Sequence, residues 1–346
     1  MVEIDSSRIF DWGPAPGRPQ IILAPMEGVT DEPMRALLTE LGGFTFCVSE
    51  FMRISQDVPG KSTFHHHVPE LKHQARTPSG IRVHFQLLGG NAEKLALAAQ
   101  RACDEGARGV DLNFGCPSPT VNGNDGGASL LKHPDRIYQI VRTVRAAVPA
   151  DLPVSAKMRL GWESMNDIHH NAERAAEAGA SWITIHGRTK EQGYRPPAYW
   201  GPIGEVNRRL GRHIPIIANG DLWNLDAYLR CRDETQCEHY MLGRSALANP
   251  HLARQIAGLQ TESTRWEERE TWVPLLKRFS EITPVLPKLN SYLARRSKQW
   301  LNFARIAQPL PWWEDVKRMD SFADIIAYLE TGHTSKSERL LGSAQH

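Results

Sequence analysis

The stretch VDLNFGCPSPTVNGNDGGASLL, residues 110–131, begins as a short apolar strand and then breaks into a loop of glycine, proline and asparagine. Cys116 lies in that loop, close behind the strand. A helix is predicted next, because Pro134 stands where a first-turn proline is tolerated and apolar residues recur after it at helical spacing. Most free cysteines are small buried side chains, but one held on such a loop is also open to a ligand. The order strand, loop and helix is the unit whose repetition decides the fold.

The same unit recurs along the chain. Short apolar strands are predicted at 21–24, 44–49, 82–87, 110–113, 154–158, 182–186, 214–218 and 240–242. Helices are predicted after Thr30–Asp31 and at 92–105, 134–148, 168–178, 203–210, 225–231 and 246–256. Eight short buried strands that alternate with helices predict a closed (β/α)8 TIM barrel rather than an open sheet.

The join between the second and third strands is the loosest part of this pattern. A long polar stretch there contains His65, His66 and His67. Adjacent histidines cannot all converge on one metal ion with good geometry. We therefore expect a solvated loop at this position, and no metal site in the chain.

Bulk composition indicates an ordinary globular protein. The chain has 346 residues, 41% of them hydrophobic, which is enough for one large domain and a smaller one. The net charge of +2 gives no overall preference for nucleic acid. Five cysteines without C-x-x-C spacing favour reduced thiols over disulfides or a zinc site. With no signal-peptide pattern and no apolar run of membrane-spanning length, we expect a cytoplasmic protein with no membrane contact.

Polar residues and glycines stand at the predicted C-terminal ends of the strands. These residues are Pro25, Met26, Glu27, Glu50, Gln86, Asn113, Cys116, Lys157, Arg159, His186, Asn219, Gly220, Asp221, Gly243 and Arg244. Functional side chains of (β/α)8 barrels come from this end, where a purely structural barrel needs only turn residues. Each has a structural explanation when taken alone, such as a turn at Asn219–Gly220 or a buried core position for His186. Their convergence on one rim predicts a functional site.

The loops after the seventh and eighth strands predict a phosphorylated ligand. Such loops often bind phosphate through backbone N–H groups. Gly220 and Gly243 would let a phosphate approach closely, and Arg244 could pair with it. Lys157 would then place positive charge near an electron-rich ring. Its alternative role is a Schiff base, as in barrel aldolases, but an aldolase would leave Cys116 unexplained.

The segment beyond the barrel differs in composition. Helices are predicted at 266–282, 289–306, 312–319 and 322–329. Residues 283–313 contain no acidic residue, but they contain the basic residues Lys288, Arg295, Arg296, Lys298 and Arg305 and the aromatic residues Tyr292, Trp300 and Phe303. Composition alone favours an ordinary helix with a solvated basic face and Trp300 in its core over a nucleic-acid surface with aromatic platforms for bases. The expected organisation is a lead-in (1–19), a barrel (20–257), a helical domain (258–333) and a flexible tail (334–346).

Four segments, taken together and in this order, resemble the tRNA-dihydrouridine synthases, most closely the bacterial C subgroup. They are APMEGVTD at 24–31, NFGCPS at 113–118, HGRTKEQGY at 186–194, and IANGD at 217–221 with LGR at 242–244. The resemblance implies an FMN-binding barrel with a C-terminal helical domain. It also implies reduction of a uridine in the tRNA D-loop, with NADPH as the electron donor. The subgroup implies position 16 of the tRNA, and neither a protein partner nor an oligomer is implied.

The resemblance also assigns roles to individual residues. The implied FMN contacts are Pro25, Met26, Glu27, Gln86, Lys157, His186, Asn219, Gly220, Asp221, Gly243 and Arg244. The implied tRNA contacts are Arg53, Arg195, Arg296 and Lys298, with Lys317 less directly matched. Cys116 is implied to be the proton donor, and a thiol near its usual pKa of about 8.5 does carry a proton at neutral pH. Asn113 would orient the uracil. A base inside folded tRNA must be extruded to reach such a rim, so an RNA-binding surface is required.

Three positions depart from the family's pattern. Pro119 stands where a basic residue is frequent, Ala198–Tyr199 replaces an acidic or polar pair, and Lys317 stands where the C subgroup would have arginine. Arginine and lysine differ as phosphate partners, so Lys317 weakens the position-16 prediction more than the enzyme prediction. Two alternatives stay open at this point: an FMN-dependent barrel enzyme for a free pyrimidine, and a non-catalytic tRNA-binding protein.

Overall fold

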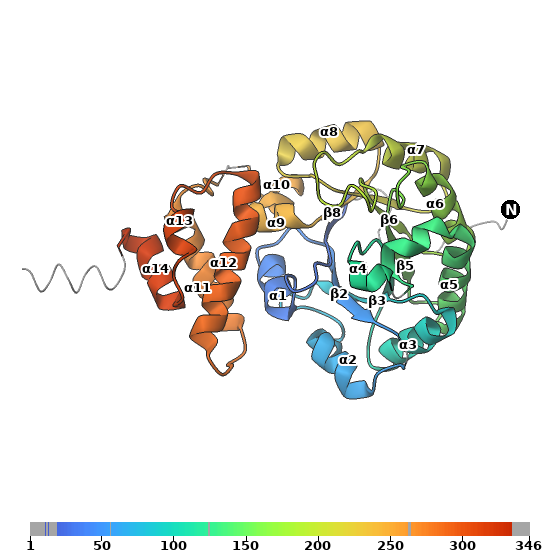
Figure 1. Cartoon of the computed structure of the whole chain (residues 1–346), viewed down its shortest axis with the longest axis horizontal. Helices are drawn as coiled ribbons and strands as arrows, with labels where there is room; N and C mark the ends of the chain where they lie inside the picture. The colour runs from blue at the N-terminus through green and yellow to red at the C-terminus, as the bar shows by residue number, and fades with distance from the viewer. Residues whose placement is uncertain are drawn as a thin grey trace, which may run out of the picture.

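A closed barrel of parallel strands forms the centre of the molecule (Figure 1). The computed structural model describes residues 11, 13, 19–55, 57–123, 125–261 and 264–333. The strands are β1 (Ile21–Leu23), β2 (Phe46–Arg53), β3 (Arg82–Leu88), β4 (Val110–Phe114), β5 (Val154–Arg159), β6 (Ile183–His186), β7 (Ile216–Asn219) and β8 (His239–Leu242). They follow one another around the barrel in chain order, and β8 pairs with β1 to close it. The predicted (β/α)8 barrel is confirmed.

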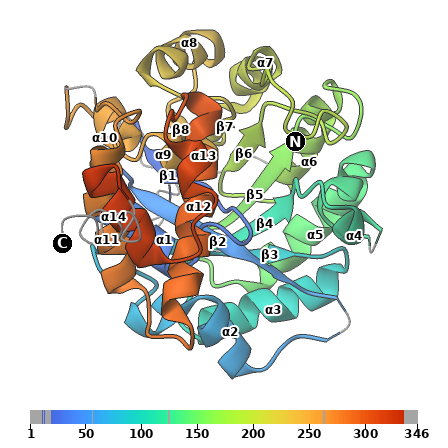
Figure 2. The same ribbon diagram turned by 60° about the vertical axis from the view of Figure 1, so that its left-hand side comes forward.

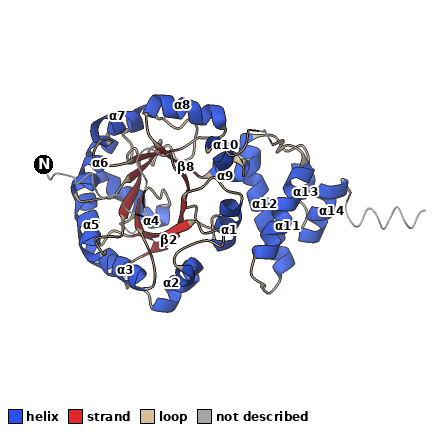
Figure 3. Ribbon diagram, turned by 180° about the vertical axis from the view of Figure 1, so that it is seen from behind, coloured by secondary structure: helices blue, strands red, loops and turns tan. Residues whose placement is uncertain are grey.

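Helices surround the barrel, as Figure 3 shows from behind. They are α1 (Glu32–Glu40), α3 (Ala92–Asp104), α5 (Pro134–Ala147), α6 (Asp167–Glu177), α7 (Gly201–Leu210), α8 (Leu225–Thr235), α9 (Arg244–Ala248) and α10 (Leu252–Ile256). The single helix predicted at 246–256 is two helices in the structure. Asn249 leaves helical geometry at φ −133° because Pro250 disfavours helical backbone in the residue before it. Among the described residues, no helix is both long enough and apolar enough to span a membrane.

The second strand is longer than predicted. It was expected to end at Ser49, with Glu50 just after it, but β2 continues to Arg53. The pairing between β2 and β3 shifts between Val48 and Phe51, which marks a bulge. The polar pair Ser49–Glu50 interrupts the apolar pattern, so the sequence predicts the end of the strand there. In the structure the bulge accommodates this pair, and the strand continues beyond it.

The prediction of a loop around the three histidines was wrong. Residues 61–67 form α2 (Lys61–His67), followed by the 3₁₀ helix η1 (Pro69–His73). Phe64 fixes α2 in place, because its buried ring stacks on Phe85 at 5.4 Å between centroids. Two of the histidines have separate partners: His65 Nε2 lies 2.8 Å from Glu105 Oε2, and His67 Nε2 lies 3.0 Å from the Glu50 carbonyl oxygen.

The C-terminal helices pack against one side of the barrel, next to α1 and α9 (Figures 1 and 2). They are the 3₁₀ helix η3 (Arg269–Trp272), α11 (Val273–Ile282), α12 (Leu289–Ala307), α13 (Trp313–Val316) and α14 (Phe322–Thr331). Trp300 of α12 is 1% exposed, and its indole N–H donates to the Leu247 carbonyl of α9 at 2.9 Å. The idea that Trp300 is a platform for bases is therefore wrong. The apolar core runs without a break from the barrel helices into the C-terminal helices.

His239, at the start of β8, gives the fold a pH-dependent stability. Its side chain is 2% exposed, and burial lowers its pKa to about 4. An unfolded histidine has a pKa of about 6.5, so below that pH the unfolded chain binds a proton that the folded chain excludes. The stabilising effect of keeping His239 neutral is fully present above about pH 6.5. We expect the free energy of unfolding to fall by up to about 3 kcal/mol as the pH is lowered to 4.

Urea unfolding at a series of pH values measures this loss. His239→Asn should flatten the decline in unfolding free energy between pH 6.5 and 5. The exposed His213 offers a matched control, and His213→Asn should leave the decline as in the native chain. Equal slopes for the native protein and His239→Asn would show that other groups cause the acid sensitivity.

Candidate active site

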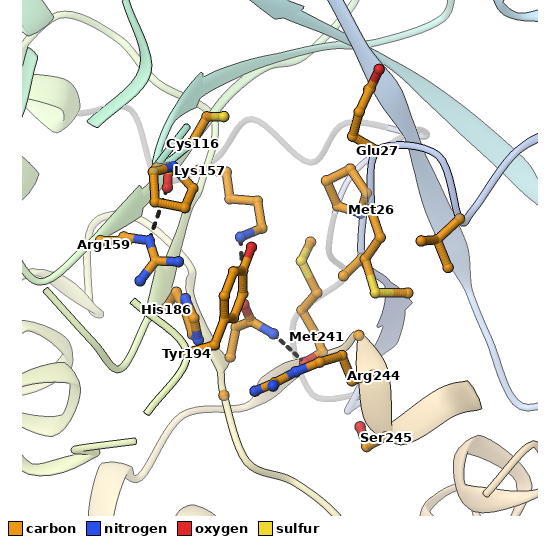
Figure 4. A pocket seen from close by; sticks show the side chains of 18 of the residues that line it. Met26, Glu27, Cys116, Lys157, Arg159, His186, Tyr194, Met241, Arg244 and Ser245 are labelled. Atoms are coloured by element: carbon orange, nitrogen blue, oxygen red, sulfur yellow. Dashed lines mark hydrogen bonds between the residues drawn. The ribbon is translucent and has the colours of Figure 1, made fainter. Parts of the chain in front are cut away.

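A cavity of about 430 Å³ opens at the C-terminal ends of the strands. It is lined by every predicted FMN contact, together with Asn113 and Cys116. These residues come from all parts of the barrel sequence, from the loop after β1 to the start of α9. Figure 4 shows Cys116 and Glu27 on opposite sides of one end of the cavity, with Arg244 and Ser245 at the other end. The sequence-based grouping on one rim is therefore a real grouping in space.

Cys116 is held in a loop whose backbone is bonded on both sides. Its N–H donates to Asn113 Oδ1 at 3.0 Å, and its carbonyl accepts from the Ala128 N–H at 3.1 Å. Gly127 is required beside it: φ is +62°, and an added Cβ would lie 3.1 Å from Cys116 Cβ. The thiol is half-buried, and burial raises its pKa above the usual range. Cys116 therefore carries its proton at neutral pH.

A chain of buried hydrogen bonds supports that loop from below. Ser155 Oγ donates to Asp111 Oδ1 at 2.5 Å, and Gln86 Nε2 donates to Asp111 Oδ2 at 2.7 Å. Gln86 Oε1 in turn accepts from Asn113 Nδ2 at 2.9 Å, and Asn113 Oδ1 accepts from the Gly115 and Cys116 N–H groups. The orientation of each amide is therefore fixed by its neighbours. Asn113 is bonded through both its Nδ2 and its Oδ1, so it fixes the position of the Cys116 backbone and of any ligand that it touches.

Lys157 and His186 form the floor of the cavity. Burial lowers the pKa of Lys157 to about 8, with Arg159 as a second cause, and Nζ lies 3.4 Å from Asn219 Oδ1. Burial, followed by the neighbouring cations, lowers the pKa of His186 well below its usual value. His186 is thus neutral. Because Arg188 Nη1 can only donate, His186 Nε2 at 3.2 Å is its acceptor and Nδ1 carries the hydrogen.

Arg244 provides the positive charge at the far end of the cavity. The Arg244 guanidinium stacks against Tyr194 and Trp223, with its carbon 5.1 and 5.2 Å from the two ring centroids. Gly220 has φ +120°, a conformation open to glycine, and an added Cβ would lie 3.0 Å from His186 Cδ2. Asp221 already accepts hydrogen bonds from Arg188 Nη2 at 2.6 Å and from the Ala198 N–H at 2.7 Å. Its place in the site is therefore to hold the loop that follows β7.

Glu27 is the acid at the opposite end. Burial among protein atoms, with the nearby Glu50 as a second cause, raises its pKa to about 7. Its side chain is nevertheless open at the cavity mouth. Glu27 therefore changes charge close to neutral pH, within the same cavity as Cys116.

The sequence assigned no role to several residues of the cavity wall, among them Arg159, Tyr194, Phe303 and Ile306. Arg159 had been noted only as a polar strand end, but its Nε donates to the Gly115 carbonyl at 2.9 Å next to Cys116. Tyr194 is 57% exposed and lies between Arg159 and Arg244, at 5.2 and 5.1 Å. Phe303 and Ile306 of α12 close the wall from the C-terminal helices. The polar strand end pointed to Arg159, but no local pattern marks two apolar helix residues as part of a distant pocket.

The predicted tRNA contacts have different surroundings. Arg195 is exposed beside Tyr194, and Arg53 is half-buried at the end of β2. Lys298 Nζ donates to the Met319 carbonyl at 2.7 Å, and Lys317 pairs with Glu314. These four stay predictions. Arg296 also stays a prediction, although it is only 6% exposed and its Nη1 and Nη2 atoms donate to oxygens of the loop after β1.

Fold and site together define the class of the protein. A closed (β/α)8 barrel with a cavity of polar and apolar residues at the C-terminal ends of its strands is the arrangement of barrel enzymes. Residues 22–309 match the family model described as "Dihydrouridine synthase (Dus)". The chain belongs to the dihydrouridine synthase family.

Curated relatives cover most of the chain. It is 44% identical over 288 residues to the tRNA-dihydrouridine(16) synthase of Aquipseudomonas alcaligenes. The aligned residues make up 82% of this chain and 89% of the relative. It is 41% identical over 320 residues to the Neisseria meningitidis serogroup B protein of the same name, with 90% and 95% covered. The Escherichia coli K12 protein of that name is 43% identical over 287 residues, with 83% and 89% covered.

Proposed function

We propose that this protein reduces uridine 16 of tRNA to 5,6-dihydrouridine, with FMN as its cofactor and NADPH as the electron donor. The observation that carries the proposal is the placement of a protonated thiol, Cys116, in one cavity with Lys157 and Arg244. Family membership and the names of the relatives support the same reaction and the same position. A cysteine kept as an acid fits proton donation to carbon, whereas a nucleophile would need a lowered pKa.

The cavity residues fit a flavin mononucleotide. Arg244, with the glycine backbone at 220 and 243, would hold the phosphate, because a planar guanidinium matches phosphate geometry and glycine permits close approach. Lys157, Gln86, Pro25 and Met26, which line the same cavity, would contact the ring system. The remaining implied contacts, Glu27, His186, Asn219 and Asp221, line the same cavity.

Cys116 would complete the reduction of the uracil ring. When bound, reduced FMN supplies a hydride for C6 of the base, with NADPH as the source of its electrons. Transfer of that hydride to C6 would break the C5=C6 π bond and leave its electron pair on C5. Cys116 Sγ–H transfers its proton to C5, and the resulting thiolate regains a proton from solvent. Asn113 holds the backbone of Cys116 in place throughout, through its bond to the Cys116 N–H.

Reconstitution tests the proposal directly. The purified chain, FMN and NADPH are incubated with unmodified tRNA, and dihydrouridine is mapped at each D-loop uridine. Reduction at position 16 is expected. Reduction at another D-loop position would overturn the position alone. Turnover of free uridine without turnover of tRNA would establish the free-pyrimidine alternative, and a protein that binds tRNA but no flavin would establish the non-catalytic one.

Phosphate contacts should give tRNA binding a steep salt dependence. Each phosphate neutralised by a basic side chain adds about 0.7 to 0.9 to the slope of log Kd against log salt. Arg195 is exposed beside the cavity. We therefore expect Arg195→Ala to lower the slope by about 0.7 to 0.9, which is the contribution of one phosphate contact. Arg230, exposed on α8 of the outer ring, is the matched control, and Arg230→Ala should keep the native slope. The same slope for both variants would exclude Arg195 as a phosphate contact.

A further inference from the structure

Arg296 of α12 makes a set of contacts that links the C-terminal helices to the loop after β1. Its Nη1 donates to the Gly28 carbonyl at 2.8 Å, and its Nη2 donates to the Val29 carbonyl at 2.8 Å. Nη2 also pairs with Asp31 Oδ1 at 2.9 Å. From the side of α11, the guanidinium carbon lies 5.7 Å from the centre of the Phe279 ring. Arg296 is thus buried among protein groups on each of these sides.

Two further residues of α12 contact the same loop. Gln299 Nε2 donates to the Gly28 carbonyl at 2.9 Å, and it is itself bonded through Oε1 to Arg296 Nη1. The Tyr292 hydroxyl lies 3.3 Å from Asp31 Oδ2. The Gly28 carbonyl therefore accepts two hydrogen bonds from α12. On its other side, the Gly28 N–H donates to Glu50 Oε1 of β2 at 2.5 Å.

The loop held in this way forms one wall of the active-site cavity. Pro25, Met26 and Glu27 line that cavity, and they immediately precede the two carbonyls that Arg296 binds. Gly28 has φ +69°, and nothing lies within 4 Å of an added Cβ, so packing around the glycine itself does not fix the turn. The turn is fixed instead by hydrogen bonds: the Val29 and Thr30 N–H groups donate to the Met26 carbonyl, both at 3.0 Å. The contacts of α12 add an external restraint to this short turn.

We propose that Arg296 is a positioning residue for the flavin site: it holds residues 25–31 in the conformation that binds the cofactor, and it does so from the helices proposed to bind tRNA. This inference rests on the proposed function, since it concerns the flavin contacts of that site. The fork of the guanidinium reaches two successive carbonyls and a carboxylate together. A lysine ammonium is a point donor and cannot span that set with the same geometry. The flavin wall therefore depends on arginine at 296.

Arg296→Lys tests the proposal, with Arg295→Lys as its matched control. Arg295 precedes Arg296 on α12 but is exposed, and a lysine there keeps a positive charge beside the Tyr292 ring that Arg295 now contacts. FMN affinity is measured by fluorescence titration of flavin-free protein, without tRNA, and tRNA affinity is measured separately. We expect Arg296→Lys to weaken FMN binding about tenfold, the equivalent of one charge-assisted hydrogen bond. Arg295→Lys should match the native protein for FMN.

Asp31→Asn gives a second variant should Arg296→Lys fail to fold. Asp31 Oδ1 accepts from the Met34 N–H as the cap of α1, and asparagine caps helices equally well. The substitution therefore removes the charge opposite Arg296 and keeps the helix, and a smaller weakening of FMN binding is expected. Native FMN affinity in both variants would overturn the inference, and weaker tRNA binding beside it would leave Arg296 as an RNA contact only. Failure of the native chain to bind FMN would overturn both the inference and the proposed cofactor, whereas FMN binding without uridine reduction would overturn the proposed reaction alone.

Discussion

Cys116→Ala should bind flavin and accept electrons from NADPH like the native protein, yet reduce uridine in tRNA at least a hundredfold more slowly. The reason is that a positioned general acid contributes about 10²- to 10⁴-fold to a proton transfer. The backbone of the loop should survive the change, because the Cys116 N–H and carbonyl keep their bonds and only the bond between the thiol and the Ser118 backbone is lost. Single-turnover measurement separates the two half-reactions: flavin reduction followed at its absorbance, and dihydrouridine formation followed in the tRNA.

Cys103→Ala is the matched control for this prediction. Cys103 is also a half-buried free thiol, but it lies on α3, and it is not among the residues that line the cavity. Its variant should form dihydrouridine at the native rate. Native turnover by Cys116→Ala would refute the assignment of Cys116 as the proton donor, whatever the flavin half-reaction shows.

Trp300→Ala should lower the free energy of unfolding by about 4 kcal/mol, the middle of the range for truncating a buried aromatic side chain. The indole is packed edge-on against Trp272 and near Phe279, at 5.8 and 6.2 Å between ring centroids. The substitution also leaves the Leu247 carbonyl of α9 without its donor. The measurement is urea unfolding followed by both tryptophan fluorescence and far-ultraviolet circular dichroism.

Two control variants show whether the loss of stability in Trp300→Ala comes from the buried position of Trp300. Trp300→Phe keeps a ring and should cost clearly less. Trp313→Ala removes a half-buried tryptophan that stacks on Arg305, and it should cost less than Trp300→Ala. Because the core is continuous, unfolding should be a single transition. A separate early transition of the C-terminal helices, with the barrel unaffected, would contradict this prediction.

Much of the fold was visible in the sequence because the barrel repeats one local pattern. Each short apolar run before a polar or glycine residue could be recognised separately, as with Val110–Phe114 followed by Cys116. Errors arose where tertiary packing decides the local structure. Phe64 turns a polar stretch into α2 by stacking on Phe85, a residue of another strand. The bulge in β2 likewise depends on its pairing with β3, which no local window contains.

Some residues of the candidate site could likewise be predicted from the sequence, and others could not. Residues at strand ends could be placed together from topology alone, because parallel strands in a closed barrel end on one rim. Residues whose surroundings depend on the other domain could not. Arg296 reads as one of several exposed basic residues on a helix, and only the packing of α12 on the loop after β1 shows that it is buried. Phe303 joins the cavity for the same reason.

The burial of the thiols has a consequence for chemical durability. The pKa is raised above the usual thiol value at all five cysteines, Cys47, Cys103, Cys116, Cys231 and Cys237, with burial as the largest cause. Peroxides and alkylating agents attack the thiolate, and these groups hold little of it at neutral pH. The environment that keeps a proton on Cys116 for the base thus also shields it from oxidants. Such a chain should resist inactivation by peroxide far better than an enzyme built on a nucleophilic cysteine.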